Sequence, residues 1–501
     1  MIMHSSRTRH AFRVVAGIIL ASGIAFGTAV AQQAAPASAA FDRSAPPAAG
    51  PTPELHVPSW TKLTLSNGAE LIVSERHELP LVSMNVTFIG GADQVDPANK
   101  PGVGEFVSSM LLEGTTTRTG DQLAEAMQSL GSSIRASVSG ETGTIGFFVM
   151  RDKFQPMLSL LEDVLVNPSF PQAALDRLRA RTLISLRQAK DRTGSIANVV
   201  FPKVLYTTSQ PYGRSLTEAS AQAITRDDLV AFHENYFKPG RAVITVVGDV
   251  KPDEVKRALD QTLAPWKAGG TKPAFDYPAP PAPKATTIYL VDKPGAAQSS
   301  FALGEVGPPR DTPDYYSLRV LNAFFGELFQ SRLNANIREQ KGYSYGVGSR
   351  FAYGRGPGAF RAGGDIVTAK TDSALIEFMK ELRGIRGERP ITDDEMQAAK
   401  NSLIQSLPRR FASVGGVSGA IGEIYSQDLP EDYFQRFAAR IDAVTKDDVL
   451  KAAQKYLDPE HMAIVIVGDR AKIEAPLAAT KIAPIVVLDV NGDPVSTRVT
   501  P

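Results

Sequence analysis

The chain repeats itself at a distance of 220 residues, and this repeat restricts its possible folds more than any other feature. The stretch "AITRDDLVAFHENYFKPGRAVITVVGD" (223–249) aligns without a gap to "AVTKDDVLKAAQKYLDPEHMAIVIVGD" (443–469), with ten of 27 positions identical. Two longer helical patterns, "FPQAALDRLRARTLISL" and "ITDDEMQAAKNSLIQSL", match each other at about the same distance. The chain is therefore predicted to contain two homologous halves in tandem.

Each repeat unit predicts an N-capped helix, a short loop with a proline and a buried strand. Thr225 and Thr445 are the N-cap candidates, and Asp228 and Asp448 follow them at the third helical position. Aspartate there suits the helix dipole, although the usual partner in a capping box is Glu or Gln. The β-branched runs "AVITVVGD" and "AIVIVGD" are typical of strands that are buried on both faces. Each half is thus expected to mix helices with a sheet.

The N-terminus has the pattern of a secretory signal peptide. The basic segment "RTRHAFR" precedes the apolar "VVAGIILASGIAFGTAV" and the small-residue cleavage site Ala29–Ala31. The alternative, a membrane anchor, is disfavoured because the apolar segment is short and contains glycines. We therefore expect residues 1–31 to be cleaved and the mature protein to be periplasmic, without a permanent membrane anchor. The chain has no cysteine, which excludes disulfides and thiolate metal sites.

Composition marks the remaining boundaries. A low-complexity stretch at residues 32–58 predicts a disordered linker, and the proline-rich "KPAFDYPAPPAPKA" within residues 271–286 predicts a semi-rigid one. The two halves then occupy residues 59–270 and 287–474. Residues 475–501 form a C-terminal extension, in which "APIVVLDVNGDPV" predicts an added strand pair.

The balance of charge gives no reason to expect a nucleic-acid partner. The whole chain has 54 basic and 53 acidic residues, and three of the arginines lie in the signal peptide. The mature chain is therefore close to neutral, whereas a nucleic-acid-binding protein usually has a basic patch.

The first half resembles the pitrilysin family, which includes insulysin, mitochondrial processing peptidase and many bacterial zinc peptidases. The resemblance rests on "LSNGAELIVSERHELPLVSMNVTFIGGADQVDP", on "GVGEFVSSMLLEGT" and on the repeated "VVGD" strand, in family order over residues 60–469. "SNG" also predicts a hairpin turn between two alternating strands. The resemblance implies an α+β fold: two homologous α/β halves in tandem, each a mainly antiparallel sheet with helices packed on it.

The resemblance also locates the zinc motif, which this chain lacks. Active members have H-x-x-E-H on a helix, in which the histidines bind zinc and the glutamate activates water. In the register set by "MLLEGT", the two histidines fall on Glu105 and Ser109, and the general base falls on Ser108. The distal zinc-binding glutamate falls near Ser185. None of the four required residues is present.

No other group of residues predicts a metal site. The mature chain has four histidines, His56, His77, His233 and His461, and no two of them share a helix turn. Serine hydroxyls are poor zinc ligands at neutral pH. We therefore expect no cofactor in this chain and no zinc peptidase activity from it alone.

The second half keeps a different family signature. In "SRLNANIREQKGYSYGVGSRF", Arg338 and Tyr345 match an arginine–tyrosine pair that, in the family, contacts the substrate backbone beside the zinc. Tyr343 is the competing tyrosine, but the spacing of seven residues favours Tyr345. Without the family register, an ion pair of Arg338 with Glu339 or Glu327 and a core tyrosine would also explain the pattern.

Together these features predict a non-catalytic, substrate-binding subunit. Some family members divide the work between a chain with H-x-x-E-H and a chain that supplies the arginine–tyrosine pair. This chain is expected to pair as a heterodimer with such a zinc-bearing partner and to bind peptides or unfolded polypeptides. The alternative is a catalytically inert binding or scaffold protein, either a homodimer or part of a membrane complex.

Overall fold

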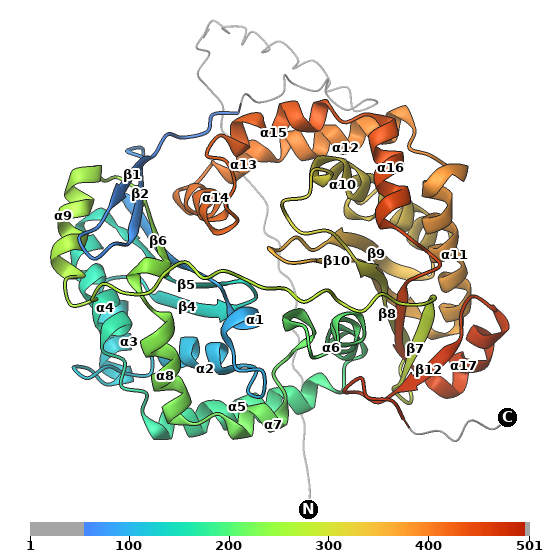
Figure 1. Ribbon diagram of the computed structural model, residues 1–501, viewed down its shortest axis with the longest axis horizontal. Helices are drawn as coiled ribbons and strands as arrows, with labels where there is room; N and C mark the ends of the chain where they lie inside the picture. Colours follow the sequence, from blue (N-terminus) through green and yellow to red (C-terminus); the bar gives the residue numbers. More distant parts are fainter. Residues whose placement is uncertain (1–54, 496–501) are drawn as a thin grey trace, which may run out of the picture. The chain divides into compact units, whose positions relative to one another are not determined.

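The computed structural model describes residues 55–495. The predicted signal peptide and all but the end of the linker at 32–58 lie outside the described residues. Each half contains a six-stranded sheet with helices packed against it (Figure 1). The predicted fold class, two mixed α/β halves in tandem, is confirmed.

The sheet of the N-terminal half has the strand order β1-β2-β6-β3-β5-β4. Its strands are β1 (Thr61–Thr64), β2 (Glu70–Glu75), β3 (Leu81–Ile89), β4 (Ile134–Ser139), β5 (Thr142–Met150) and β6 (Ala242–Gly248). Only β2 and β6 run parallel; the other neighbours are antiparallel. The predicted hairpin joins β1 to β2, with Gly68 at a φ of 89° that glycine adopts easily. Strand β6 is buried along its whole length, as its sequence predicts.

The sheet of the C-terminal half has the equivalent order β12-β7-β11-β8-β10-β9. Its strands are β7 (Thr287–Asp292), β8 (Gln298–Val306), β9 (Ser344–Phe351), β10 (Ala359–Val367), β11 (Ala463–Gly468) and β12 (Ile485–Leu488). Of the strand pair predicted near the C-terminus, β12 joins β7 and fills the edge position that β1 fills in the first half. Within the described residues the chain then turns back, and an isolated antiparallel bridge joins Leu488 to Pro494.

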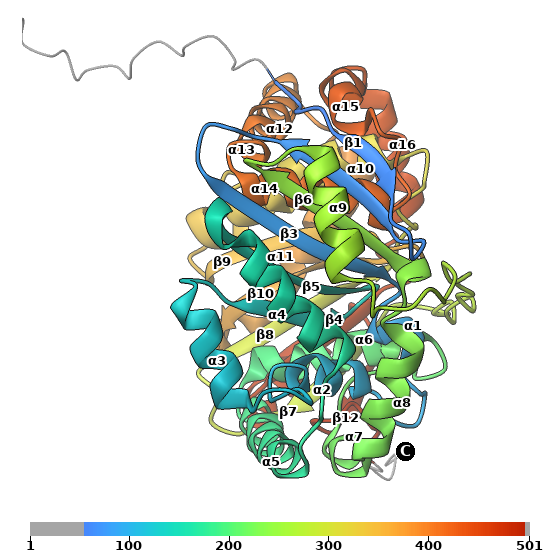
Figure 2. The same cartoon turned by 90° about the vertical axis from the view of Figure 1, so that its left-hand side faces the viewer.

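Helices cover the sheets and connect their strands. Those of the first half are α1 (Ala92–Val95), α2 (Val103–Met110), α3 (Gly120–Ser129), α4 (Phe154–Val166), α5 (Gln172–Ala189), α6 (Thr193–Tyr206), α7 (Glu218–Ala223), α8 (Arg226–Tyr236) and α9 (Pro252–Thr262). Those of the second half are α10 (Tyr315–Asn322), α11 (Thr371–Arg383), α12 (Asp393–Gln405), α13 (Leu407–Arg410), α14 (Val414–Ser426), α15 (Tyr433–Asp442), α16 (Lys446–Tyr456) and α17 (Arg470–Ala479). Helices α4 and α9 contact the N-terminal sheet on its outer side (Figure 2).

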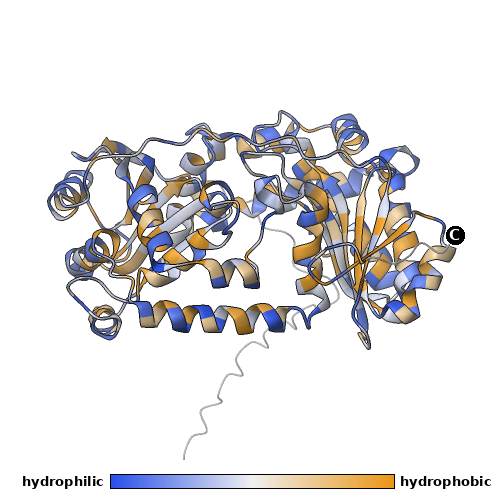
Figure 3. Ribbon diagram, turned by 60° about the horizontal axis from the view of Figure 1, so that its bottom comes forward, coloured by the Kyte–Doolittle hydropathy of each residue, from blue (hydrophilic) through white to orange (hydrophobic). Residues whose placement is uncertain are grey.

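The two halves exchange one helix each. Helix α6 belongs to the first half by sequence but packs on β8 and β11 of the second half, while α14 packs on β3 and β6 of the first (Figure 1). Buried residues of α6, such as Phe201, contribute to a core with Val465 of β11. Reciprocally, Val417 and Ile421 of α14 share a core with Val243 of β6. Strand β11 is hydrophobic and buried along its length, whereas β8 is mostly buried but includes Ser299 and Ser300. Figure 3 shows helices on which hydrophobic and hydrophilic residues alternate in bands. Each sheet therefore depends on the other half for part of its cover.

The repeated helices α8 and α16 begin as predicted. The hydroxyl oxygen of Thr225 accepts a hydrogen bond from the backbone nitrogen of Asp228, and the Asp228 carboxylate accepts one from the Thr225 nitrogen. Thr445 and Asp448 repeat this arrangement. Aspartate thus closes both capping boxes, although Glu or Gln is the commoner residue there.

No helix among residues 55–495 is long and apolar enough to cross a membrane.

Candidate functional site

Helix α2, on which the zinc motif is expected, forms at the predicted position. Its buried apolar residues are Val103, Phe106, Val107 and Met110. They hold the helix against strand β4 and helix α8. The carboxylate of Asp96 accepts hydrogen bonds from the backbone nitrogens of Gly102 (2.6 Å) and Gly104 (2.8 Å), and it thereby satisfies donors at the helix start. The backbone of the motif helix is therefore intact.

The degenerate motif positions do not all share one polar face. Glu105 and Ser109 are exposed, as predicted, but Ser108 is only 5% exposed and its hydroxyl donates to the Glu105 carbonyl oxygen (3.0 Å). From the sequence pattern of this helix, Glu105, Ser108 and Ser109 are all expected on the face opposite its apolar residues, and for Ser108 this expectation is wrong. Position 108 falls on the same side of the helix as the buried residues Gly104 and Leu111, four before it and three after it.

Residue Ser185 lies on helix α5, which contacts α2 as the family register requires. Ser185 is exposed. The side chains at the four motif positions are one carboxylate and three hydroxyls, a set that does not fit Zn²⁺. Partial desolvation in the recess beside α2 raises the pKa of Glu105. Residues 55–495 contain no cluster of three His, Cys, Asp or Glu side chains that could hold a metal ion.

Three of the four mature-chain histidines have local partners in separate elements. The ring nitrogens of His77 lie 2.7 Å from the Asp249 carboxylate and 3.1 Å from that of Glu75. A ring nitrogen of His233 lies 2.8 Å from the Leu165 carbonyl oxygen, and one of His461 lies 2.7 Å from the Asp458 carboxylate. These three histidines do not converge on a common point. Local structural roles account for them, as the sequence indicated.

Arg338 and Tyr345 are brought together. Arg338 lies in the π-helical segment η5 (Asn334–Gln340), and Tyr345 lies on the edge strand β9. The Arg338 guanidinium is 5.4 Å from the centroid of the Tyr345 ring and 4.5 Å from that of Phe329. Arg338 also forms an ion pair with Glu339 (3.2 Å), so part of the alternative interpretation holds. The alternative interpretation also required a core tyrosine, and this does not hold, because Tyr345 is 88% exposed.

The local backbone explains why Tyr345, and not Tyr343, faces outward. The pairing of β9 with β10 shifts register between Gly364 and Ile366, opposite Tyr345, and such a bulge redirects side chains at a sheet edge. Tyr343 is partly buried against the core and lies near Lys370, whose ammonium is 5.6 Å from its ring. Short π-helical segments such as η5 occur frequently at functional sites. The spacing argument thus selected the accessible tyrosine.

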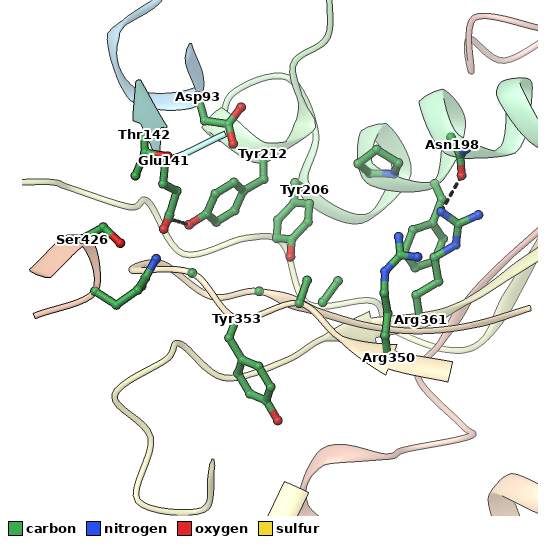
Figure 4. A pocket seen from close by; sticks show the side chains of 17 residues that line it. Asp93, Glu141, Thr142, Asn198, Tyr206, Tyr212, Arg350, Tyr353, Arg361 and Ser426 are labelled. Carbon is green, nitrogen blue, oxygen red and sulfur yellow. Dashed lines mark hydrogen bonds between the residues drawn. The ribbon is translucent and has the colours of Figure 1, made fainter. Parts of the chain in front are cut away.

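A cavity of about 660 Å³ lies where the two halves meet (Figure 4). Glu141, in the turn between β4 and β5, spans this junction. Its carboxylate accepts hydrogen bonds from the hydroxyls of Tyr212 and Tyr277 and from the Arg355 backbone nitrogen (2.8 Å). Tyr277 belongs to the proline-rich linker and Arg355 to the second half, so one side chain ties three segments together.

Sequence reasoning did not identify this cavity. Its walls include α6, the β4–β5 turn, β9, β10 and the end of α14, which are far apart in the chain. One sequence feature could have indicated part of the cavity: the glycine-rich turn in "SRFAYGRGPGAFRAGG". A hairpin centred on its glycine-rich turn would have placed Arg350 opposite Arg361, as the structure does.

The comparisons with known proteins agree with this fold. Residues 71–220 match the family described as Insulinase (Peptidase family M16), and residues 223–403 match the Peptidase M16 inactive domain. The chain therefore belongs to the M16 peptidase family, in which it is an inactive homologue. This finding confirms the family resemblance read from the sequence.

Individual relatives span most of the chain. An uncharacterized zinc protease of Rickettsia felis is 23% identical and covers 78% of this chain and 93% of its own length. The non-peptidase homolog YmxG of Helicobacter pylori is 22% identical, with 80% of this chain and 92% of its own length covered. The crystal structure of a peptidase M16 inactive domain from Pseudomonas fluorescens superposes with a TM-score of 0.75 at 27% identity, over 82% of this chain and 98% of that one.

Proposed function

We propose that this chain is the substrate-binding, non-catalytic subunit of a heterodimeric zinc metallopeptidase that degrades peptides or unfolded polypeptides. In this assembly a second M16 chain with H-x-x-E-H holds the zinc. Arg338 and Tyr345 of this chain contact the substrate at the partner's metal site. The signal-peptide pattern of residues 1–31 supports a periplasmic location for the complex.

The observation that carries the proposal is the exposed Arg338–Tyr345 pair. A tyrosine that is 88% exposed contributes little to the stability of its own chain, yet its ring lies beside a guanidinium. Arginine offers fixed charged donors, and tyrosine offers a neutral hydroxyl. Both can hydrogen-bond a peptide carbonyl as it gains negative charge. The first half of this chain has no fitting zinc ligands, so such chemistry requires metal from another chain.

The test is peptide hydrolysis by the assembled complex. We expect Arg338→Ala and Tyr345→Phe each to lower kcat at least tenfold, since removing a donor aimed at developing charge typically costs about 3–4 kcal/mol. Complex formation and the zinc content of the partner should not change. Tyr343→Phe, two residues away, and Glu339→Gln, which removes only the ion pair, are the matched controls.

Two further results test this proposal, and the second of them separates it from an inert scaffold. Metal analysis of the isolated chain should find no stoichiometric zinc after mild chelation. Full activity of the complex with Arg338→Ala and Tyr345→Phe combined would reject a role in chemistry and leave the scaffold.

A further inference from the structure

Two arginines face each other across neighbouring strands in the cavity between the halves. Arg361 of β10 pairs directly with Arg350 of β9. The adjoining pair, Phe360 and Phe351, is buried in the core, so by the alternation of strands the arginines project from the opposite face. That face borders the cavity, and both side chains line it (Figure 4).

Neither arginine has an acidic partner within ion-pair distance among residues 55–495. Arg361 donates to the Asn198 side-chain oxygen of α6 (2.7 Å) and lies 5.5 Å from the centroid of the Phe201 ring. Desolvation, followed by the charge of Arg350, lowers the pKa of Arg361 to about 10. Like charges directly opposite each other on a sheet are destabilising. The described part of the chain therefore holds two cations without an acidic partner side by side, of which Arg361 is partly buried and Arg350 is exposed.

The acidic residues of the cavity do not relieve this charge. Asp93 and Glu141 lie on the other side of the cavity from the arginines (Figure 4). The Glu141 carboxylate is already bonded to Tyr212, Tyr277 and the Arg355 backbone. The cavity is thus cationic at its β9–β10 end, where an anion would remove the repulsion.

We propose that Arg350 and Arg361 form a carboxylate-binding site for peptides that enter this cavity. Guanidinium groups bind carboxylates through paired hydrogen bonds, and a cavity of about 660 Å³ falls in the usual range of ligand sites. The nearby rings of Phe201 and Tyr206 provide apolar contact for the rest of the peptide. The carboxylate is either the C-terminus of the peptide or an acidic side chain. The site rests on the proposed peptide binding but involves neither Arg338 nor Tyr345.

The experiment is calorimetric titration of the full chain with three N-acetylated pentapeptides whose residues are uncharged except where stated. One has a free C-terminal carboxylate, one a C-terminal amide, and one an amide together with a central glutamate. We expect at least one carboxylate-bearing peptide to bind at least tenfold more tightly than the neutral amide. Arg350→Gln and Arg361→Gln should each reduce that binding about tenfold, as expected for loss of a charged hydrogen bond. Arg257→Gln, which removes an exposed arginine on α9, is the control.

Preference for the free C-terminus or for glutamate identifies the source of the carboxylate. Equal binding of all three peptides, no binding of any, binding unaffected by the two variants, or binding of inorganic phosphate alone would overturn the proposal. The titrations use the isolated chain without a zinc partner. Their failure would therefore leave the proposed role of Arg338 and Tyr345 to be judged by its own assay.

Thermal unfolding separates this site from a structural role of the arginines. Arg361→Gln should raise the Tm of the free chain, because it removes a desolvated charge and its repulsion from Arg350. The peptide that binds should raise the Tm of the natural chain and not that of the variant. A fall in Tm in the variant, together with unchanged peptide affinity, would show that Arg361 only fastens α6 to the sheet.

Discussion

The two halves have equivalent folds, but they differ in what stands at the positions where active family members have functional residues. The N-terminal half lacks the zinc ligands, whereas the C-terminal half keeps the arginine–tyrosine pair. In the N-terminal half, α2 packs against β4 and α8 while its motif positions carry Glu105, Ser108 and Ser109. In the C-terminal half, η5 and β9 hold Arg338 beside an exposed Tyr345. The comparison teaches that the fold and the chemistry depend on separate residues. The apolar face of α2 maintains the helix, so metal ligands on the other face can be absent without loss of structure.

The largest expected effect comes from separating the halves, because the exchanged helices make each one incomplete. Residues 55–270 alone leave the α14-binding face of β3 and β6 uncovered and expose the apolar side of α6. We expect either half alone to aggregate or to lack fixed side-chain packing, as judged by near-UV circular dichroism. Coexpression of 55–270 with 271–495 should restore a one-to-one complex. If a single half were soluble and unfolded cooperatively, the exchanged helices would not be required for folding.

The next effect concerns the junction at Glu141. Glu141→Gln weakens the acceptor for two tyrosine hydroxyls and a backbone nitrogen. We expect a loss of about 2–3 kcal/mol in the free energy of unfolding, measured with urea, because hydrogen bonds to charged groups contribute most. Glu339→Gln removes a more exposed carboxylate with a single ion pair and should cost less than about 0.5 kcal/mol. A loss of less than about 0.5 kcal/mol for Glu141→Gln would show that its hydrogen bonds at the junction add little to stability.

A smaller effect appears as a pH dependence that both halves share. Burial raises the pKa of Asp93 in the first half to about 6 and that of Glu305 in the second to about 7. Each carboxyl therefore holds its proton more firmly in the folded chain than in the unfolded chain. The resulting stability is complete below their ordinary pKa values and is lost as the pH rises through about 6 and about 7, respectively.

Asp93→Asn and Glu305→Gln should each stabilise the chain by about 1–2 kcal/mol at pH 8 and by almost nothing at pH 4. Urea unfolding at both pH values measures the difference. A gain that is equal at the two pH values would assign the effect to packing instead of ionisation.

The smallest effect compares the two repeated capping boxes. Thr225→Ala and Thr445→Ala should each cost about 1 kcal/mol, since both hydroxyls accept from the third helical nitrogen. Asp228→Asn should cost more than Asp448→Asn, because the Asp228 carboxylate also binds the Lys100 ammonium at 2.7 Å. Thermal unfolding of the four variants tests whether the repeats are energetically equivalent. A larger loss for Asp448→Asn would contradict this ranking.

Local features of the fold could be predicted from the sequence, while contacts between distant segments could not. The threonine caps, the turn at Gly68 and the buried strand β6 are determined by neighbouring residues, and all three are present. The exchange of α6 and α14 was not predicted. An apolar helix face such as that of "TGSIANVVFPKVLY" reveals that it will be buried, but not against which sheet.

The same distinction between local features and distant contacts applies to the candidate site. The family register, with its spacing of seven residues, selected Tyr345 over Tyr343, and the helix end and the following strand that carry Arg338 and Tyr345 are close in the chain. The burial of Ser108 was missed because it depends on how α2 is turned against β4. The facing arginines were missed because their significance comes from the cavity wall, to which α6 contributes from about 150 residues away.

The exchanged helix α14 and the terminal strand β12 also set the order in which the chain can fold during synthesis. The N-terminal sheet cannot be covered until residues 414–426 have emerged from the ribosome. The C-terminal sheet needs residues 485–488, and Lys203 of α6 bonds to the Asn491 carbonyl (2.8 Å) and the Asp493 carboxylate (2.6 Å). The first half therefore cannot finish folding while the second is still being made. Such a chain spends most of its synthesis with apolar strands uncovered, and uncovered strands favour aggregation until the exchanged helix is available.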